Sequence, residues 1–276
     1  MSTPSNTSQT LAFIGGGNMA SAIIGGLIKQ GTPPNRIVVV EPFADARTRL
    51  NSQFGVRTLA TADANLAQAG LVIWAVKPQT FKEAAQQTRD FCANALHLSV
   101  AAGIRSDSIA NWLGTQRVVR AMPNTPALVG LGQTGLFART AVTPQDKAWI
   151  EQVIATTGAL LWVKDESLLD AVTAISGSGP AYVFFFIEAM VEAGVKMGLT
   201  PEQATQLAIG TFEGASLLAK TATEPPSVLR ERVTSKGGTT YAALTSMQNA
   251  RVGELFQVAL QAAQQRAHEL GDEFGA

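Results

Sequence analysis

The chain has 276 residues, which is enough for one large domain or for two domains of ordinary size. Hydrophobic residues make up 46% of it and charged residues only 15%, which predicts extensive burial, including burial at a subunit interface. The 21 basic and 21 acidic residues balance and form no basic run, so nucleic acid is not an expected partner.

The cysteine content and the N-terminus exclude further classes of protein. Cys92 is the one cysteine, so an internal disulfide is impossible, and with two scattered histidines it makes no metal site. We interpret it as a buried or unreactive thiol. Residues 1–10 contain no basic residue, unlike a signal peptide, and no stretch of 18 residues is apolar without a charge, glycine or proline. The sequence therefore predicts a cytoplasmic protein without a membrane partner.

The first predicted strand, residues 11–14, runs into three glycines and then into a helical pattern. Gly15 permits a tight turn, and Gly17 keeps a side chain out of the path of a pyrophosphate, which the amides of the helix N-terminus attract. We interpret this stretch as a dinucleotide site, with a flexible turn that binds nothing as the alternative. Its expected contacts are Ile14, Gly15, Gly16, Gly17, Asn18 and Met19.

The second predicted strand, residues 36–41, ends in Glu41, which follows Gly17 by 24 residues. A carboxylate at this place accepts hydrogen bonds from the adenosine ribose. A solvated loop carboxylate is the alternative. Arg47 and Arg49 follow and are able to meet a 2′-phosphate, so the sequence leaves NADH and NADPH both open.

Two later strands end at the same edge of the predicted sheet, the second of them in small residues. We predict a short helix around residues 63–69 and strands over 71–78 and 96–103. The ends of such strands line the ligand crevice in open α/β sheets. The expected nucleotide contacts are Ala75, Val76, Lys77, Pro78, Val100, Ala101 and Ala102. Lys77 is alternatively an exposed lysine without a partner.

Strand signals continue to about residue 164 and then stop. Strands are predicted over residues 118–122, 134–138 and 160–163, and a helix over 144–156. Alternating strands and helices predict an α/β Rossmann-type domain with a doubly wound parallel sheet over residues 1–164. An all-α domain follows over residues 165–276, with helices predicted over 165–175, 181–197, a segment opened by Thr200-Pro201-Glu202-Gln203, 227–233, 241–247 and 252–270.

Two stretches rich in glycine, serine and threonine, residues 176–180 and 234–240, interrupt these helices. Each places free amides and hydroxyls at a helix N-terminus, where a substrate carboxylate can bind. Ordinary helix–helix turns are the alternative. The helix over 181–197 is apolar on nearly all sides, so we expect it to be buried within a domain or between subunits.

These motifs resemble the pyrroline-5-carboxylate reductase family. The run from Pro226 to Gln248, with Ser235-Lys236-Gly237-Gly238-Thr239-Thr240 as its core, is similar to the family's C-terminal signature. Ser176-Gly177-Ser178-Gly179-Pro180-Ala181-Tyr182 resembles a second motif. Residues 13–20, 75–78, 101–103 and 122–126 resemble its nucleotide-domain motifs, so the resemblance covers the chain from Leu11 onward. Lys236 and Glu41 depart from residues that many relatives carry.

The resemblance implies that NADH or NADPH transfers a hydride to the imine carbon of 1-pyrroline-5-carboxylate and gives L-proline. It also implies a Rossmann domain followed by an all-α domain that forms an intertwined homodimer, often assembled further. Thr240 is implied as the catalytic residue, with a hydroxyl that reaches the ring nitrogen. The implied substrate-binding residues are Ser176, Gly177, Gly179, Pro180, Gly237, Gly238, Thr239 and Thr240.

Two other functions fit the same layout. β-Hydroxyacid dehydrogenases need a lysine on the first helix after the glycine-rich substrate motif, to take the hydroxyl proton. Residues 182–193 contain no lysine, and Lys196 comes too late, which disfavours that family. A non-catalytic nucleotide-binding protein is the second alternative, and it predicts cofactor binding without turnover.

Overall fold

The computed structural model describes residues 9–275. Contacts divide this part of the chain into two compact units, one of residues 9–178 and 263–275 and the other of Gly179–Ala262. The domain boundary that the sequence predicts after Lys164 stays a prediction. Residues 1–8, which carry most of the argument against a signal peptide, lie outside the described residues.

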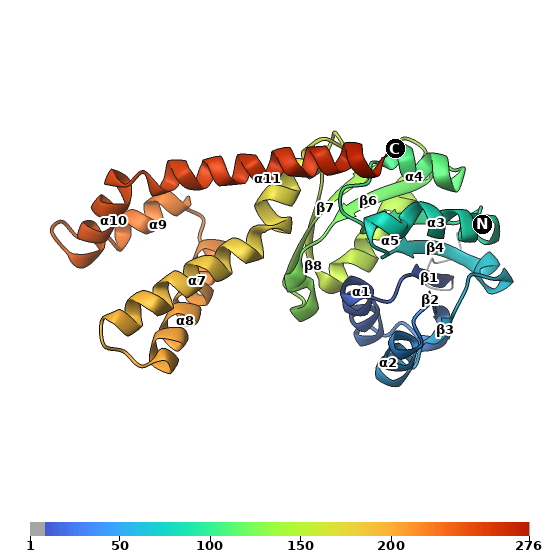
Figure 1. The fold of residues 1–276 in the computed structure, drawn as a ribbon, viewed down its shortest axis with the longest axis horizontal. Coiled ribbons are helices and arrows are strands. Elements are labelled where there is room, and N and C mark those ends of the chain that lie inside the picture. The colour runs from blue at the N-terminus through green and yellow to red at the C-terminus, as the bar shows by residue number, and fades with distance from the viewer. Residues whose placement is uncertain (1–8, 276) are drawn as a thin grey trace. The chain divides into compact units, whose positions relative to one another are not determined.

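The first unit is built on an eight-stranded sheet (Figure 1), in the order β3-β2-β1-β4-β5-β6-β7-β8. Neighbouring strands from β3 to β6 in this order are parallel, as predicted, whereas β6 and β7 are antiparallel. The predicted Rossmann-type sheet is therefore confirmed as mostly parallel, and β7 departs from it because residues 123–131 are too short for a crossover between parallel strands. The strands are β1 Thr10–Ile14, β2 Ile37–Val40, β3 Arg57–Leu59, β4 Ala69–Trp74, β5 Leu96–Ser99, β6 Val118–Met122, β7 Gly132–Ala138 and β8 Gly158–Trp162.

Both faces of this sheet are buried, which explains why its inner strands read as continuous apolar runs. Leu11 and Phe13 of β1 belong to one core cluster, and Ala12 and Ile14 to another. Cys92 is buried as well, and its burial raises the pKa of the thiol to about 11, as expected of an unreactive cysteine. The helices are α1 Asn18–Lys29, α2 Ala44–Phe54, α3 Pro78–Thr88, α4 Ser106–Leu113, α5 Pro144–Ile154 and α6 Leu168–Val172, with short turns η2 Pro34–Arg36, η3 Ala64–Gln68, η4 Arg89–Phe91, η5 Thr125–Val129 and η6 Ala155–Thr157.

The second unit consists of helices. The predicted start at Thr200 is confirmed by a reciprocal capping box: Thr200 Oγ1 accepts from Gln203 N at 3.2 Å, and Gln203 Oε1 accepts from Thr200 N at 3.0 Å. The helices are α7 Gly179–Lys196, α8 Pro201–Thr221, α9 Pro226–Arg232, α10 Thr239–Asn249 and α11 Val252–Phe274, the last of which extends into the first unit from Ala263.

The helix break predicted at residues 176–180 is wrong. A π-helical turn, η7 Thr173–Gly177, joins α6 to α7, and Ser178 N donates five residues back to Thr173 O at 2.8 Å. The result is one helix over Leu168–Lys196 that is long and apolar enough, by length and composition only, to cross a membrane. The prediction that no segment could span a membrane depended on a helix break at residues 176–180, and the structure has no break there.

A buried histidine in this core makes stability depend on pH. His97 Nδ1 accepts from Trp74 Nε1 at 3.1 Å, and burial, followed by the charge of Arg117, lowers the pKa of His97 from 6.5 to about 4. Below its unfolded pKa the unfolded chain binds this proton and the folded chain does not. The free energy of unfolding should therefore fall as the pH drops from about 6.5 to 4, by up to about 3 kcal/mol.

Urea unfolding between pH 4 and pH 8 measures this loss. His97→Asn keeps an acceptor for Trp74 but does not titrate, so we expect its free energy of unfolding to fall less than that of the wild type over the same range. An equal fall in both proteins would show that His97 does not set the acid sensitivity.

Candidate active site

The glycine turn after β1 is crowded on one side and open on the other. Gly15 has a φ of +95°, and a Cβ there would lie 2.6 Å from Ala75 O. A Cβ at Gly16 would lie 2.5 Å from Leu50 Cδ1, whereas one at Gly17 would meet nothing within 4 Å. Backbone contact and the positive φ therefore require glycine at position 15, whereas a side chain at position 16 would displace Leu50. Gly17 is the N-cap of α1 and makes no side-chain cap, so the first amides of the helix have no partner within it and are available to an anion.

Glu41 is buried at the end of β2, so it is not a solvated loop carboxylate. Its Oε2 accepts from Gly16 N at 2.8 Å, its Oε1 accepts from Phe43 N at 3.0 Å, and the residue is 7% exposed. The Nη1 of Arg47 donates to the carbonyls of Glu41 and Pro42 at 2.8 and 2.7 Å. The Glu41 carboxylate is therefore hydrogen-bonded to the glycine turn, and Arg47 is hydrogen-bonded to backbone carbonyls.

The ends of β4 and β5 meet the glycine turn. Ala75 N donates to Ile14 O at 2.8 Å, and Val76 Cγ1 lies 3.1 Å from the place of a Cβ on Gly15. Lys77 is the N-cap of α3 and its side chain is exposed. Val100 is half-buried, Ala101 is buried and Ala102 is exposed. The structure therefore brings the predicted nucleotide residues of the three strands to one edge of the sheet.

Asn124 joins this edge to the π-helical turn, and the sequence analysis did not single it out as a site residue. Its Nδ2 donates to Ser176 O at 3.0 Å and its Oδ1 accepts from Gln133 N at 2.9 Å. Gly177 also packs closely here, since a Cβ on it would lie 2.5 Å from Met122 Cε. The turn after β6 therefore holds Ser176 and Gly177.

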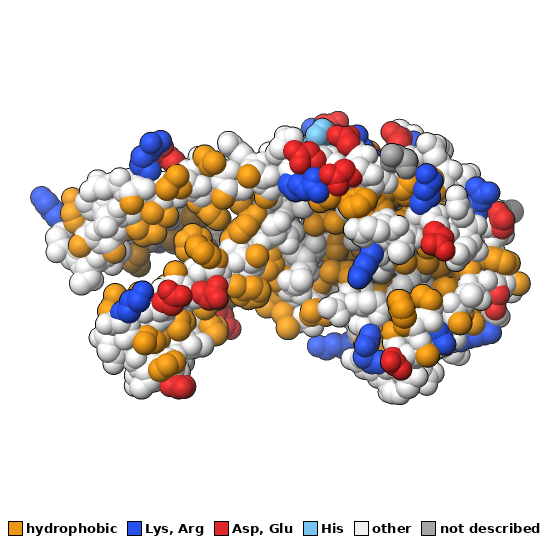
Figure 2. Space-filling view, in the orientation of Figure 1, with side chains coloured by type: hydrophobic (Ala, Val, Ile, Leu, Met, Phe, Trp, Pro, Cys, Tyr) orange, Lys and Arg blue, Asp and Glu red, His pale blue; other side chains and the backbone are white. Residues whose placement is uncertain are grey.

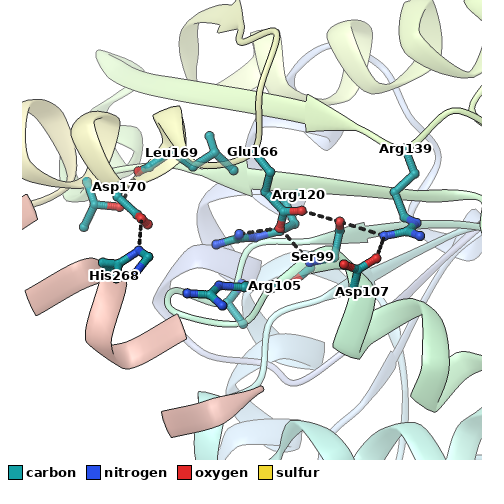
Figure 3. Close-up of polar contacts among 12 residues, drawn as sticks. Ser99, Arg105, Asp107, Arg120, Arg139, Glu166, Leu169, Asp170 and His268 are labelled. Carbon is teal, nitrogen blue, oxygen red and sulfur yellow. Dashed lines mark hydrogen bonds and ion pairs between the residues drawn. The ribbon is translucent and has the colours of Figure 1, made fainter. Parts of the chain in front are cut away.

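An ion-pair network fixes the segment that leads into α6 (Figure 3). Glu166 accepts from Ser106 N at 2.6 Å at the start of α4 and pairs with Arg120 of β6. On the other side, His268 Nδ1 lies 3.4 Å from Asp170 Oδ2. These contacts attach α6 and the end of α11 to the sheet of the same unit.

The second predicted substrate stretch begins α10. Gly237 has a φ of +74°, which favours glycine, and Gly238 is an N-cap without a side-chain cap. Thr239 and Thr240 open the helix, so their amides have no partner within it. The amide of Gly238 donates to Ser235 O at 3.0 Å and is used within the turn. This stretch belongs to the second unit, and Thr240 is half-buried.

Comparison with known proteins gives two family models and many close relatives. A model of pyrroline-5-carboxylate reductase dimerisation matches residues 166–270, and one of coenzyme F420-dependent NADP oxidoreductase matches residues 10–103. The chain is 42% identical over 277 residues to pyrroline-5-carboxylate reductase of Pseudomonas aeruginosa, with both chains covered completely. The enzyme of Vibrio alginolyticus is 39% identical, with 95% of this chain and 97% of that one covered.

Solved structures of pyrroline-5-carboxylate reductases are also similar to this chain. A pyrroline-5-carboxylate reductase from Coxiella burnetii has a TM-score of 0.90 and 39% identity, covering 95% of this chain and 98% of that one. The Plasmodium falciparum enzyme with NADP bound has a TM-score of 0.85 and 26% identity, covering 96% and 99%.

The open space at Gly17 gives a direct test of the nucleotide site. Gly17→Val places a side chain where no protein atom lies, so we expect folding to be retained and NADH affinity to fall more than about 100-fold, because the side chain would occupy the place of the phosphates. Calorimetric titration with NADH measures the affinity, and a thermal melt checks the fold. Unchanged affinity in a folded variant would mean that the pyrophosphate lies elsewhere.

Proposed function

This chain belongs to the pyrroline-5-carboxylate reductase family, and we propose here which of its residues carry out that family's reaction. It is an enzyme of proline biosynthesis that reduces 1-pyrroline-5-carboxylate to L-proline with NADH or NADPH. The roles of single residues, the preferred cofactor and the compartment are our proposals.

The homodimer accounts for the apolar surface of the second unit. Many large apolar side chains are exposed along α7, α8 and α11 (Figure 2), and those of Gly179–Ala262 fall within the residues matched by the dimerisation model. A second copy that covers them buries the helix Leu168–Lys196 without any membrane. They include Phe184, Phe185, Leu207, Leu218 and Val258. The enzyme is soluble, and we place it in the cytoplasm, where a free thiol such as Cys92 stays reduced.

The protein's task in this reduction is positioning. The bound nicotinamide would supply the hydride, and the protonated imine already carries the proton of the product amine, so the residues need only hold the imine and the cofactor in place. The fit of the first unit to a dinucleotide is supported by the open space at Gly17, the uncapped start of α1 and the buried carboxylate of Glu41. The remaining proposed contacts are Ile14, Gly15, Gly16, Asn18, Met19, Ala75, Val76, Lys77, Pro78, Val100, Ala101 and Ala102.

For the substrate, we assign the carboxylate to the start of α10. The amides of Thr239 and Thr240 have no helical partner, and the positive end of the helix dipole adds to their attraction for an anion. The Gly237 turn leaves them accessible. The Thr240 hydroxyl then orients the ring nitrogen. Ser176, Gly177, Gly179 and Pro180 complete the proposed substrate residues.

Glu41 leads us to propose a preference for NADH. A 2′-phosphate beside the ribose would meet a buried carboxylate that two backbone amides already hold in place. The Nη1 of Arg47 is bound to two carbonyls, so this nitrogen is not free to donate to a 2′-phosphate. Ribose hydroxyls can instead donate to the carboxylate.

Replacing Thr240 tests the substrate assignment. Thr240→Ala removes the hydroxyl, and we expect kcat/KM for 1-pyrroline-5-carboxylate to fall about tenfold or more, because a polar group of the substrate loses its partner. Thr240→Ser keeps the hydroxyl and is the control that should retain most activity. Steady-state kinetics with NADH measure kcat/KM. A wild-type kcat/KM in Thr240→Ala would show that the Thr240 hydroxyl does not orient the substrate.

Replacing Glu41 tests the cofactor preference. Glu41→Gln keeps an oxygen for the Gly16 amide but removes the charge, so the ratio of kcat/KM for NADPH to that for NADH should rise about tenfold. Asp45→Asn, which removes an exposed charge from the first turn of α2, should leave the ratio unchanged. A ratio that moves equally in both variants, or in neither, contradicts the assignment.

A further inference from the structure

The carbonyl of Ser176 lacks the donor that an α-helix would give it. In an α-helix the amide four residues later donates to each carbonyl, and here that residue is Pro180, which has no N–H. The helix widens at this point into the π-helical turn η7, in which Ser178 N reaches back to Thr173 O at 2.8 Å. A carbonyl without a donor in a partly buried turn is destabilising unless another group supplies one.

Asn124 supplies that donor from outside the helix. Its Nδ2 lies 3.0 Å from Ser176 O, and the residue is only 8% exposed. The orientation of its amide is fixed from the other side, because Gln133 N can only donate and binds Oδ1 at 2.9 Å. The side chain therefore connects β7 to the π-helical turn through two hydrogen bonds.

The side chain of Asn124 does not make the hydrogen bond that its position in the chain predicts. Asn124 is the N-cap residue of η5, where an asparagine side chain usually accepts from an amide of the following turn. It makes no such cap and points to Ser176 instead. Pro123 and Pro126, on either side, restrict the backbone that presents it.

We propose that Asn124 is a positioning residue for the reduction: it holds the turn at residues 176–180 in the shape that binds 1-pyrroline-5-carboxylate. The inference rests on the proposed assignment of Ser176, Gly177, Gly179 and Pro180 to the substrate. Asn124 acts through the Ser176 carbonyl and does not touch the reacting atoms. Its loss should therefore raise KM for the substrate and leave kcat and NADH affinity nearly unchanged.

Two substitutions test this role. In Asn124→Asp the introduced carboxylate still accepts from Gln133 N but cannot donate to Ser176 O, so KM should rise about tenfold at pH 8. A protonated carboxyl donates again, so the ratio of variant to wild-type KM should fall as the pH is lowered; the ratio cancels the titration of the substrate. Asn124→Ala loses the donor at every pH, so its ratio should be raised and independent of pH.

Asn51→Asp is the matched control. Asn51 Nδ2 also donates to a backbone carbonyl, that of Val56, at 3.2 Å, but it lies in α2. We expect this variant to keep the wild-type KM. NADH binding and thermal melts on all variants separate a local effect from general unfolding, and a KM rise that accompanies weakened NADH binding would overturn the proposal.

Gly179→Ala separates this inference from the substrate assignment. A Cβ at position 179 meets no protein atom within 4 Å, so it should leave the fold unchanged and raise KM only by contact with the substrate. If Gly179→Ala raises KM while both Asn124 variants stay within twofold of the wild type, Asn124 has no positioning role and the substrate assignment stands. If Gly179→Ala also leaves KM unchanged, both the inference and the assignment of residues 176–180 are wrong.

Discussion

The edge of the sheet at which the glycine turn meets the ends of β4 and β5 depends on backbone hydrogen bonds that continue the parallel ladder one residue beyond the strands. These bonds run from Gly15 N to Val40 O, from Ala75 N to Ile14 O and from Val100 N to Trp74 O, at 2.8, 2.8 and 3.0 Å. The first residue of each loop is still hydrogen-bonded to the neighbouring strand. The three loops therefore leave the sheet at the same level. The close approach of Gly15 to Ala75 O follows from this, and so does the need for glycine at that position.

The sequence predicts the inner strands well and the outer elements poorly, for a physical reason. The inner strands β1, β2, β4 and β5 are buried on both faces, so composition alone distinguishes them. By contrast, α2 buries only Leu50, and β3 is a three-residue strand at the edge of the sheet, so neither leaves a hydrophobic pattern. The antiparallel direction of β7 depends on the short connection from β6, and patterns of residue types do not reveal the length of that connection directly.

The candidate site was predictable where backbone geometry demands particular residues. Gly15 is recognisable because any side chain would meet the Ala75 backbone, and the capping box at Thr200 because its residue types are restrictive. The π-helical turn was not predictable from the same rules. A Gly-Ser-Gly-Pro run ordinarily ends a helix, whereas here the helix continues and Asn124, 52 residues away in the chain, donates to the Ser176 carbonyl. Sequence spacing carries no signal for that contact.

The chemistry explains why so few side chains matter. Hydride transfer to an imine draws its reducing power from the cofactor, so the protein contributes mostly backbone amides, helix ends and the absence of side chains. In the proposed site, glycines supply all three in the two stretches assigned to the substrate and in the turn assigned to the nucleotide. The proposed roles of side chains are those that backbone cannot fill: Glu41 to place a charge, Thr240 to reach a ring nitrogen, and Asn124 to satisfy a carbonyl that Pro180 leaves free. Substitution of the half-buried Thr240 should therefore change affinity with less effect on folding than substitution of Gly15, whose Cβ would meet the Ala75 backbone.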